Sequence, residues 1–381
     1  MKRCAITPRQ DWQASLERLG FSYHSIDGNY WQETAYYAFD DAQIDVLETA
    51  TQELHAMYLQ AIAKIVQVGD YKHLGVTEHQ AALIEQSFLA KDPCLYGRFD
   101  LSYDGVGAPK LLEYNADTPT ALFEASVAQW YWLKERPDLS WRADQFNSIH
   151  EQLVLAWQSL SQTHHWQKVH FCAVTDSIED LVTCRYLQDT AIQAGIKTSL
   201  LDMTDIGYDG VDFVDLVGAP MQTVFKLYPW EWLTEEPFGV HLGATRTQWL
   251  EPAWKLLLSN KAMLCVLWQM FEGHPNLLPC YFDETKLGAY YVKKPFFSRE
   301  GANISLKNEQ SVEYSTGDYG QEGYVYQAVK PLPKFVNTQG QAVYAVIGSW
   351  VIEHTPAGIG IREDSSLITK DSSLFVPHVF Y

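Results

Sequence analysis

Residues 95–120, LYGRFDLSYDGVGAPKLLEYNADTPT, decide how the fold is interpreted. Side chains alternate with a period of two from Leu95 to Tyr103 and again from Lys110 to Asn115, which predicts two strands. The segment Asp104-Gly105-Val106-Gly107 joins them and supplies the glycines that a tight connection with positive φ requires. The sequence therefore predicts a β-hairpin.

One face of this hairpin collects polar side chains. Residues two apart in a strand face the same way, so Arg98 lies beside Asp100, and Glu113 lies beside Asn115. Pairing of the strands would place all four on one small surface, although a solvent-exposed hairpin is the alternative. The apolar face expected to pack on the core consists of Leu95, Phe99, Leu101, Leu112 and Tyr114.

The chemistry of this polar face suits a metal and a phosphate. Side-chain oxygens of Asp100, Glu113 and Asn115 are the hard ligands that Mg²⁺ prefers. The neighbouring Arg98 can stabilise negative charge on a phosphoryl group during its transfer. The turn that follows, Ala116-Asp117-Thr118-Pro119-Thr120, offers hydroxyls and backbone amides to anions. The four side chains therefore predict a metal–phosphate site.

The regions before and after the hairpin differ in pattern. Residues 1–90 are predicted to be mainly helical, as in Asp41 to Val68, where apolar residues recur at helical spacing. From Glu251 a helix precedes a series of strand-like segments. These are Tyr290 to Pro295, Tyr324 to Lys330, Ala342 to Ile352 and Gly358 to Arg362.

A β-α-β pattern fills the middle of the chain. Val169 to Thr175 predicts a strand, Glu179 to Ala194 a helix that stops at Gly195, and Lys197 to Leu201 a second strand. This unit looks inserted into one mixed α+β domain, which would leave a cleft. We therefore expect three parts: residues 1–121 with the metal-binding hairpin, an inserted α/β substrate-side subdomain at 122–250, and 251–381 with the nucleotide-binding lysines and loop.

Composition limits the classes of partner. With 47% hydrophobic and 20% charged residues the chain is an ordinary globular protein. Its formal charge of −19 argues against nucleic acid as a partner, although a nucleotide can still bind where a few Lys and Arg side chains converge. The six cysteines show no zinc-site spacing, and His164-His165 suits a solvated loop.

The sequence also indicates a cytoplasmic protein with no membrane partner. MKRCAITPRQDW lacks the apolar segment of a signal peptide. The most apolar stretch, Trp254 to Phe271, is short for a membrane span and is interrupted by Lys255 and Lys261. The sequence does not define the oligomeric state, and a homodimer is compatible with it.

A family resemblance is carried by six segments, which in chain order are YGRFDLSYDG, LLEYNADTPT, EPAWKLLLSNKAML, VKKPFFSREGANI, YVYQAVKPLPKF and GIGIREDSSLI. They resemble the glutathionylspermidine synthase family, in its synthetase domain, and most closely its stand-alone bacterial acid-amine ligase-like members. The resemblance runs over nearly the whole chain. It implies an ATP-grasp fold with an inserted α/β pre-ATP-grasp-like subdomain, and the use of ATP and two Mg²⁺ ions.

The resemblance assigns the nucleotide and metal residues. It implies that Arg98 binds ATP and stabilises the transition state, and that Asp100, Glu113 and Asn115 bind magnesium. Lys261 and Lys294 would contact phosphates, and Arg362 would either do the same or form a salt bridge. The loop from Ser298 to Asn303 would cover the phosphates. The implied nucleotide-binding residues are Arg98, Phe99, Asp100, Lys261, Lys294 and Gly301, together with Gln327, Ala328, Val329 and Lys330, which would line the adenine, and Leu367, which would pack on it.

The substrate residues that the resemblance implies are Thr118, Thr120, Glu179 and Asp180. The last two open a helix, where acidic residues also simply complement the helix dipole. The segment Trp230-Glu231-Trp232 stands where the family has small hydroxyl residues, which puts glutathione itself in question as the acid.

These assignments imply a reaction that joins a small-molecule acid and an amine. The acid would be a small peptide or a glutathione-like compound, and the amine a polyamine or an amino compound. A substrate carboxylate would attack the γ-phosphate of ATP, and the amine would then displace phosphate from the acyl-phosphate. The alternatives are a carboxylate kinase of ATP-grasp type and a non-catalytic nucleotide-binding scaffold.

Overall fold

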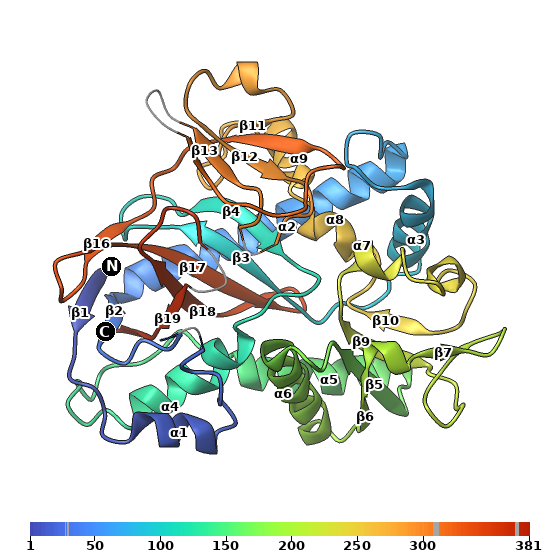
Figure 1. The fold of residues 1–381 in the computed structure, drawn as a ribbon, viewed down its shortest axis with the longest axis horizontal. Helices are drawn as coiled ribbons and strands as arrows, with labels where there is room; N and C mark the ends of the chain where they lie inside the picture. Colours follow the sequence, from blue (N-terminus) through green and yellow to red (C-terminus); the bar gives the residue numbers. More distant parts are fainter. Residues whose placement is uncertain (27, 29, 300, 308–311, 370–372) are drawn as a thin grey trace.

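The structure, a computed structural model, describes residues 1–26, 28, 30–299, 301–307, 312–369 and 373–381 (Figure 1). Within these residues the chain is a mixed α/β protein with five sheets, and the predicted α+β mixture of strands and helices is present. The largest sheet, at the centre of Figure 1, is antiparallel and contains the predicted hairpin. Its strand order is β19 (Leu374–Val376), β18 (Thr355–Asp364), β17 (Ala342–Ile352), β3 (Tyr96–Ser102) and β4 (Lys110–Asn115), with β16 (Lys334–Val336) paired to β17.

The predicted hairpin is confirmed as β3 and β4, an antiparallel pair. Its connection uses the two predicted glycines, Gly105 and Gly107, at φ of 91° and 73°. Arg98 lies opposite Asn115, and Asp100 lies opposite Glu113. The alternation of side chains and the pairing of the two strands thus bring the four polar residues together, as predicted.

One residue of the hairpin faces the other way from our expectation. The register shifts after Asp100, so that Leu101 pairs with Leu111 and Leu112 is the extra residue of a β-bulge. Leu111 therefore enters the core, and Leu112 turns to the polar face, where it lines a cavity. The prediction that Leu112 packs on the core was wrong because the bulge interrupts the period of two.

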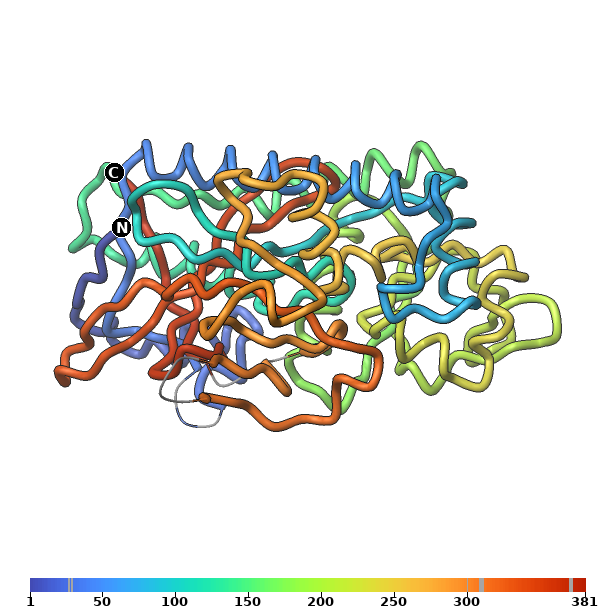
Figure 2. Tube along the Cα trace, turned by 90° about the horizontal axis from the view of Figure 1, so that it is seen from above, coloured from blue at the N-terminus to red at the C-terminus, as the bar shows by residue number. Residues whose placement is uncertain are grey.

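A long helix, α2 (Asp41–Val68), supports the central sheet and has the bounds that the sequence predicts. It begins with a capping box formed by Asp40 and Gln43, and it ends at Gly69, which has a φ of 70°. Its apolar stripe packs against β17 and β18. Figure 2 shows α2 lying along one side of the molecule.

A second antiparallel sheet lies above the hairpin in Figure 1. The predicted strand at Tyr290 to Pro295 is its central member, β12, and brings Lys294 toward the hairpin. The helix α9 (Ala262–Met270) packs against its strands β11 and β15, while α8 (Lys255–Ser259) packs against β4 of the hairpin. Its order is β11 (Cys280–Tyr281), β15 (Tyr324–Ala328), β12 (Tyr291–Pro295), β13 (Ser305–Lys307) and β14 (Val312–Tyr314).

The predicted β-α-β unit is confirmed as β5 (Lys168–Ala173), α6 (Ile178–Gln193) and β6 (Lys197–Asp202). Gly195 adopts a φ of 88° after the helix, as its predicted role as a stop requires. These strands belong to a parallel sheet, shown at the lower right of Figure 1. Its order is β10 (Gln248–Leu250), β9 (Thr223–Leu227), β5 and β6, and α5 (Ile149–His164) packs against α6.

The sequence analysis missed a three-stranded sheet that joins the two ends of the chain. Its order is β1 (Lys2–Ala5), β2 (Ala35–Phe39) and β20 (His378–Phe380), so the N- and C-termini lie at the same end of the molecule (Figures 1 and 2). The small hairpin β7 (Gly207–Tyr208) and β8 (Phe213–Val214) is the fifth sheet. The remaining helical elements are α1 (Trp12–Arg18), α3 (Glu78–Leu89), the π-helix η1 (Glu124–Ala128), α4 (Gln129–Lys134), η2 (Met203–Asp205), α7 (Trp230–Leu233), η3 (Gly239–His241) and η4 (Glu284–Lys286).

The predicted boundaries at residues 121 and 250 remain predictions. The central sheet does combine strands from residues 96–115 with strands from 334–376. The parallel sheet shares an apolar core with it, since Tyr96 stacks on Trp350 and also packs beside Phe225. Among the described residues, no helix is both long and apolar enough to cross a membrane.

Candidate active site

A cavity of about 490 Å³ brings most of the predicted site residues together. Its centre is charged and includes Arg98, Asp100, Glu113 and Asn115 of the hairpin. On one side of the centre lie the antiparallel strands β12 and β15, and on the other lie the first turn of α6 and the end of β9. The cavity is therefore built from the three predicted parts of the chain.

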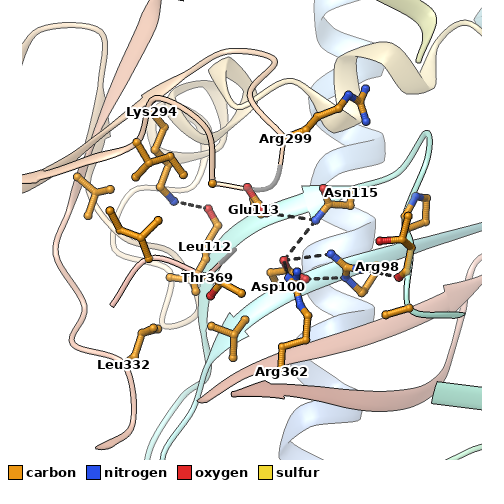
Figure 3. Close-up of a pocket in the computed structure, with 18 of the residues that line it drawn as sticks. Arg98, Asp100, Leu112, Glu113, Asn115, Lys294, Arg299, Leu332, Arg362 and Thr369 are labelled. Atoms are coloured by element: carbon orange, nitrogen blue, oxygen red, sulfur yellow. Dashed lines mark hydrogen bonds and ion pairs between the residues drawn. The ribbon is translucent and has the colours of Figure 1, made fainter. Parts of the chain in front are cut away.

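Asp100 is the hub of the charged centre (Figure 3). Nε of Arg98 donates to its Oδ1 at 2.7 Å, and Nη2 of Arg362 donates to its Oδ2 at 2.5 Å. Asn115 donates its Nδ2 to Asp100 at 3.4 Å and to Glu113 at 3.3 Å. Of the two roles considered for Arg362, the structure contains the salt bridge, and the same guanidinium also lines the cavity.

Glu113 is surrounded by lysines. Nζ of Lys261 lies 3.0 Å from Oε2 of Glu113. Burial raises the pKa of Glu113, but the positive charges of Lys261 and then Lys294 outweigh it and hold that pKa well below its usual range. The carboxyl group is therefore ionised at neutral pH. Lys261 also donates to the backbone oxygen of Ser298 at 2.6 Å, which ties it to the start of the predicted loop.

Lys294 of β12 is held by residues of β4 and of β15, the strand that pairs with β12. Its Nζ donates to the backbone oxygen of Leu112 at 2.9 Å and to Oε1 of Gln327 at 2.7 Å. Gln327 in turn donates to the backbone oxygen of Leu111 at 3.0 Å. Burial lowers the pKa of Lys294 to about 8, although the charge of Glu113 opposes this. Gln327, predicted to lie along the adenine, thus also positions the lysine.

Arg98 is fixed on both sides. Its Nη1 donates to the backbone oxygen of Thr120 at 2.6 Å, and its guanidinium lies 5.7 Å from the ring centre of Trp350. Gly348 lies opposite Asp100 on β17 and leaves room for the arginine, because a Cβ atom there would come within 2.8 Å of Cδ of Arg98. This fixed geometry suits a group that must stabilise developing charge.

The charges at the centre fit a nucleotide with magnesium. Four cations, Arg98, Arg362, Lys261 and Lys294, surround two carboxylates, so the centre keeps a positive excess that suits phosphate oxygens. The side-chain amide of Asn115 lies within hydrogen-bond reach of both carboxylates, and a rotation of this amide would present its oxygen to a cation. In the described part of the chain no group of three or more His, Cys, Asp or Glu could hold a metal ion. A mixed set of two carboxylates and one amide is compatible with the oxygen ligands that Mg²⁺ prefers.

One end of the cavity is apolar. Ala328, Val329 and Lys330 line it, as does Leu367, and these are four of the residues predicted to hold the adenine. Phe99, another of the residues predicted to bind the nucleotide, instead faces the core and stacks on Tyr114 at a centroid distance of 3.8 Å. The other side chains that make this end apolar are Leu112, Tyr290, Val292, Ile304, Leu306, Leu332, Val346 and Ile368.

The other end carries the predicted substrate residues. Thr118, Thr120, Glu179 and Asp180 all line it, as does Tyr30. Of the two tryptophans that stand where the family has small hydroxyl residues, Trp232 lines the cavity. Trp230 is instead buried, with its Nε1 bonded to the backbone oxygen of Glu251.

Part of the predicted phosphate-covering loop rests on this end. Arg299 donates to Oγ1 of Thr118 at 2.5 Å and forms an ion pair with Glu231 at 2.6 Å. Gly301 has a φ of 71°, and a Cβ atom there would lie 2.5 Å from the backbone oxygen of Thr369. Glu300 of this loop lies outside the described residues. The loop therefore links the charged centre to the substrate end.

Several residues of the site escaped the sequence analysis. Lys226 is fully buried and pairs with Asp117 at 2.7 Å, and Asp117 also accepts a bond from the backbone nitrogen of Trp230. A charged residue inside the apolar segment Thr223–Leu227 was the available signal for this pair. Tyr30 gave no signal, because its place in the cavity depends on contacts distant in sequence.

Comparison with known proteins places this geometry in a family context. Residues 3–381 match the family described as "Glutathionylspermidine synthase preATP-grasp". The chain is 42% identical over 398 residues to the "Putative acid--amine ligase" of Haemophilus influenzae, with 100% of both chains covered. It is 25% identical over 404 residues to the "Bifunctional glutathionylspermidine synthetase/amidase" of Escherichia coli, where the match covers 96% of this chain and 63% of that protein.

A solved structure shares the fold. It is a glutathione synthetase-like effector from Globodera pallida, with a TM-score of 0.58, 10% sequence identity, and coverage of 99% of this chain and 100% of that chain. At this identity the likeness concerns the fold alone.

Proposed function

This chain belongs to the glutathionylspermidine synthase family, and on that basis we propose that it is an ATP- and Mg²⁺-dependent carboxylate-amine ligase of the ATP-grasp type. The observation that carries the proposal is the order of chemistry along one cavity. An apolar end, a cationic centre with two carboxylates, and a polar substrate end follow one another. That order matches a nucleotide whose γ-phosphate meets a second substrate.

The nucleotide would lie between the apolar end and the centre. The adenine suits the surface around Leu367 and Val329, while Lys294, Lys261 and Arg98 suit the phosphates. Asp100, Glu113 and Asn115 would hold Mg²⁺, in agreement with the two ions that the family resemblance implies. When bound, magnesium neutralises charge on the phosphates.

The reaction would proceed in two steps. A carboxylate at the substrate end attacks the γ-phosphate of ATP, which forms an acyl-phosphate and releases ADP. An amine then attacks the acyl carbon and releases inorganic phosphate, so that an amide remains. Arg98 and Lys294 would offset the negative charge as it redistributes. Arg299 contacts Thr118 and Glu231, and we expect these contacts to hold the start of the loop against the substrate end and help to keep water from the acyl-phosphate.

The acid is proposed to be a small peptide or a glutathione-like compound, and the amine a polyamine or amino compound. The names of the relatives support this class. Trp232 distinguishes the substrate end of this chain, because a large ring occupies space beside Thr118. The acid that fits best is therefore expected to have an apolar group that can pack on the ring.

Phosphate release provides the test. The protein is mixed with MgATP, an acid panel that includes glutathione, and either spermidine, an amino-acid amine or no amine. Amine-dependent release together with an amide product supports the ligase. Release with acid alone would indicate a carboxylate kinase, and nucleotide binding without release in any mixture would indicate a scaffold.

A matched pair of variants tests the metal assignment in the same assay. Asp100→Asn should abolish magnesium-dependent turnover, because it removes a charged ligand and the partner of Arg98 and Arg362. Asp104→Asn alters an exposed carboxylate in the turn of the same hairpin and should behave as the wild type. Equal activity of the two variants would contradict the assignment.

A further inference from the structure

A buried carboxylate lies behind the substrate end of the cavity. Glu124 begins the π-helix η1 and is 0% exposed. The hydroxyl of Tyr23 donates to its Oε1 at 3.0 Å. Its Oε2 is also buried, and within the described residues it has no hydrogen-bond partner. A buried carboxylate oxygen without a partner costs free energy, so its retention calls for a functional reason.

Tyr30 connects this carboxylate to the cavity. It lines the substrate end, and its ring packs beside that of Tyr23. Burial, and then the negative charge of Glu124, raise the pKa of Tyr30 well above its usual value. The hydroxyl therefore keeps its proton at neutral pH. It can donate toward Glu124 while its lone pair accepts from a group in the cavity.

The charges around Glu124 allow it to take up a proton. Burial raises its pKa, while its own backbone, the nearby hydroxyls of Tyr30 and Tyr23, and then the charge of Arg98 oppose the rise without cancelling it. Glu179 faces the same tyrosines from α6, and Arg362 faces Tyr30 from β18. The two carboxylates at the proposed phosphate position already have charged partners: Asp100 pairs with Arg98 and Arg362, and Glu113 pairs with Lys261.

The proposed ligation needs a proton acceptor at this end. An alkyl amine resembles a lysine side chain and is protonated at neutral pH. It must lose one proton before its nitrogen can attack the acyl-phosphate, and water is excluded from a closed site. A group at the wall of the substrate end is well placed for this transfer.

We propose that Tyr30 and Glu124 form a proton relay that activates the amine substrate; this inference rests on the proposed ligase function. An N–H bond of the ammonium group breaks, and its proton passes to the hydroxyl oxygen of Tyr30 as the tyrosine's own proton passes to Oε2 of Glu124. The electron pair left on nitrogen forms the C–N bond, the C–O bond to phosphate breaks, and the departing phosphate takes the second proton from the nitrogen, so that a neutral amide remains. Tyr30 touches the substrate, whereas Glu124 acts through it as a positioning residue and proton store.

Two nucleophiles distinguish this role from a structural one. Wild-type protein, glutathione and MgATP are incubated with spermidine, which is protonated at neutral pH, or with hydroxylamine, which is largely uncharged there and traps acyl-phosphates as hydroxamates. Glu124→Gln keeps the size and one hydrogen-bond acceptor but cannot store the proton. At pH 7 it should slow amide formation with spermidine about 100-fold, the usual contribution of a general base. Hydroxamate formation should stay near the wild-type rate.

The pH profile and further variants complete the test. Raising the pH should restore amide formation by Glu124→Gln, because solution then supplies the free amine. Tyr30→Phe should show the same selective loss, and it replaces Glu124→Gln if that variant does not fold. Tyr23→Phe removes the hydroxyl that donates to Oε1 of Glu124 but changes a residue that does not line the cavity, and should form both products normally.

Each remaining outcome would overturn a stated claim. If both products fall together in Glu124→Gln and in Tyr30→Phe, or if neither falls, the relay is wrong. If wild-type protein forms neither product, the proposed function itself fails with this acid, and the relay falls with it.

Discussion

Lys294 should make the affinity for ATP depend on pH. Burial lowers its pKa to about 8, against the opposing charge of Glu113. With that pKa, about nine tenths of the molecules carry the lysine charge at pH 7, and about one tenth carry it at pH 9. If the charged form binds the phosphates, ATP should bind about tenfold more weakly at pH 9 than at pH 7, a difference of about 1.4 kcal/mol.

The direction of this pH dependence follows from the lowered pKa of Lys294. Because the pKa of a buried lysine is lowered, the charge is lost as pH rises through about 8 rather than near its ordinary value. Bound phosphates would stabilise the ammonium form and raise its pKa, so the protein would take up a proton on binding ATP. Phosphates complete their second ionisation near pH 6, so they do not change charge over the same interval.

Calorimetric titration with MgATP at pH 7, 8 and 9 measures this effect. Lys294→Met should bind weakly at every pH and lose the step near pH 8. Lys293→Met is the matched control, because Lys293 instead lies over the ring of Tyr324, 3.9 Å from its centre, and this variant should follow the wild type. A wild-type affinity that is flat from pH 7 to pH 9, or a step that survives in Lys294→Met, would refute the reasoning.

Three further predictions concern the frame of the site. Asp117→Asn should lower the free energy of unfolding by about 3–5 kcal/mol in urea denaturation, because Lys226 would stay buried without its counter-charge, and adding Lys226→Met should recover much of the loss. Gly348→Ala should displace Arg98 and slow turnover more than it weakens ATP binding in calorimetry. Trp232→Ser should change the KM for the acid and leave the KM for ATP unchanged in steady-state assays.

The hairpin could be predicted because its signals are local. Alternation alone places Arg98 with Asp100 on one face, and two glycines mark the turn. The turn sets Leu101 opposite Leu111, and the bulge at Leu112 then moves Asp100 opposite Glu113, a shift that the alternation of side chains does not predict. The β-α-β unit could be predicted equally well, since a strand, a helix with acidic residues in its first turn and a glycine stop occur in sequence order.

What the sequence did not reveal depends on distant contacts. The strand β2, AYYAF, shows no alternation of polar and apolar residues, and its partner β20 follows more than 300 residues later. Leu112 points toward the polar face and not toward the core because of a β-bulge, and no residue type in the segment predicts this bulge. Tyr30 reaches the cavity only because the N-terminal segment folds against β19, where its backbone oxygen accepts from Phe375.

The arrangement of charges explains how a chain with a net charge of −19 can present a site for a polyanion. Asp100 accepts from Arg98 and Arg362, and Glu113 contacts Lys261, so each buried cation has a nearby carboxylate that limits the cost of burial. Cations still outnumber carboxylates, which preserves a local attraction for phosphate. A magnesium ion that engaged the carboxylates would weaken their hold on the cations and leave those donors free for phosphate oxygens. Metal and nucleotide should therefore favour each other's binding, through charges that the fold has already placed.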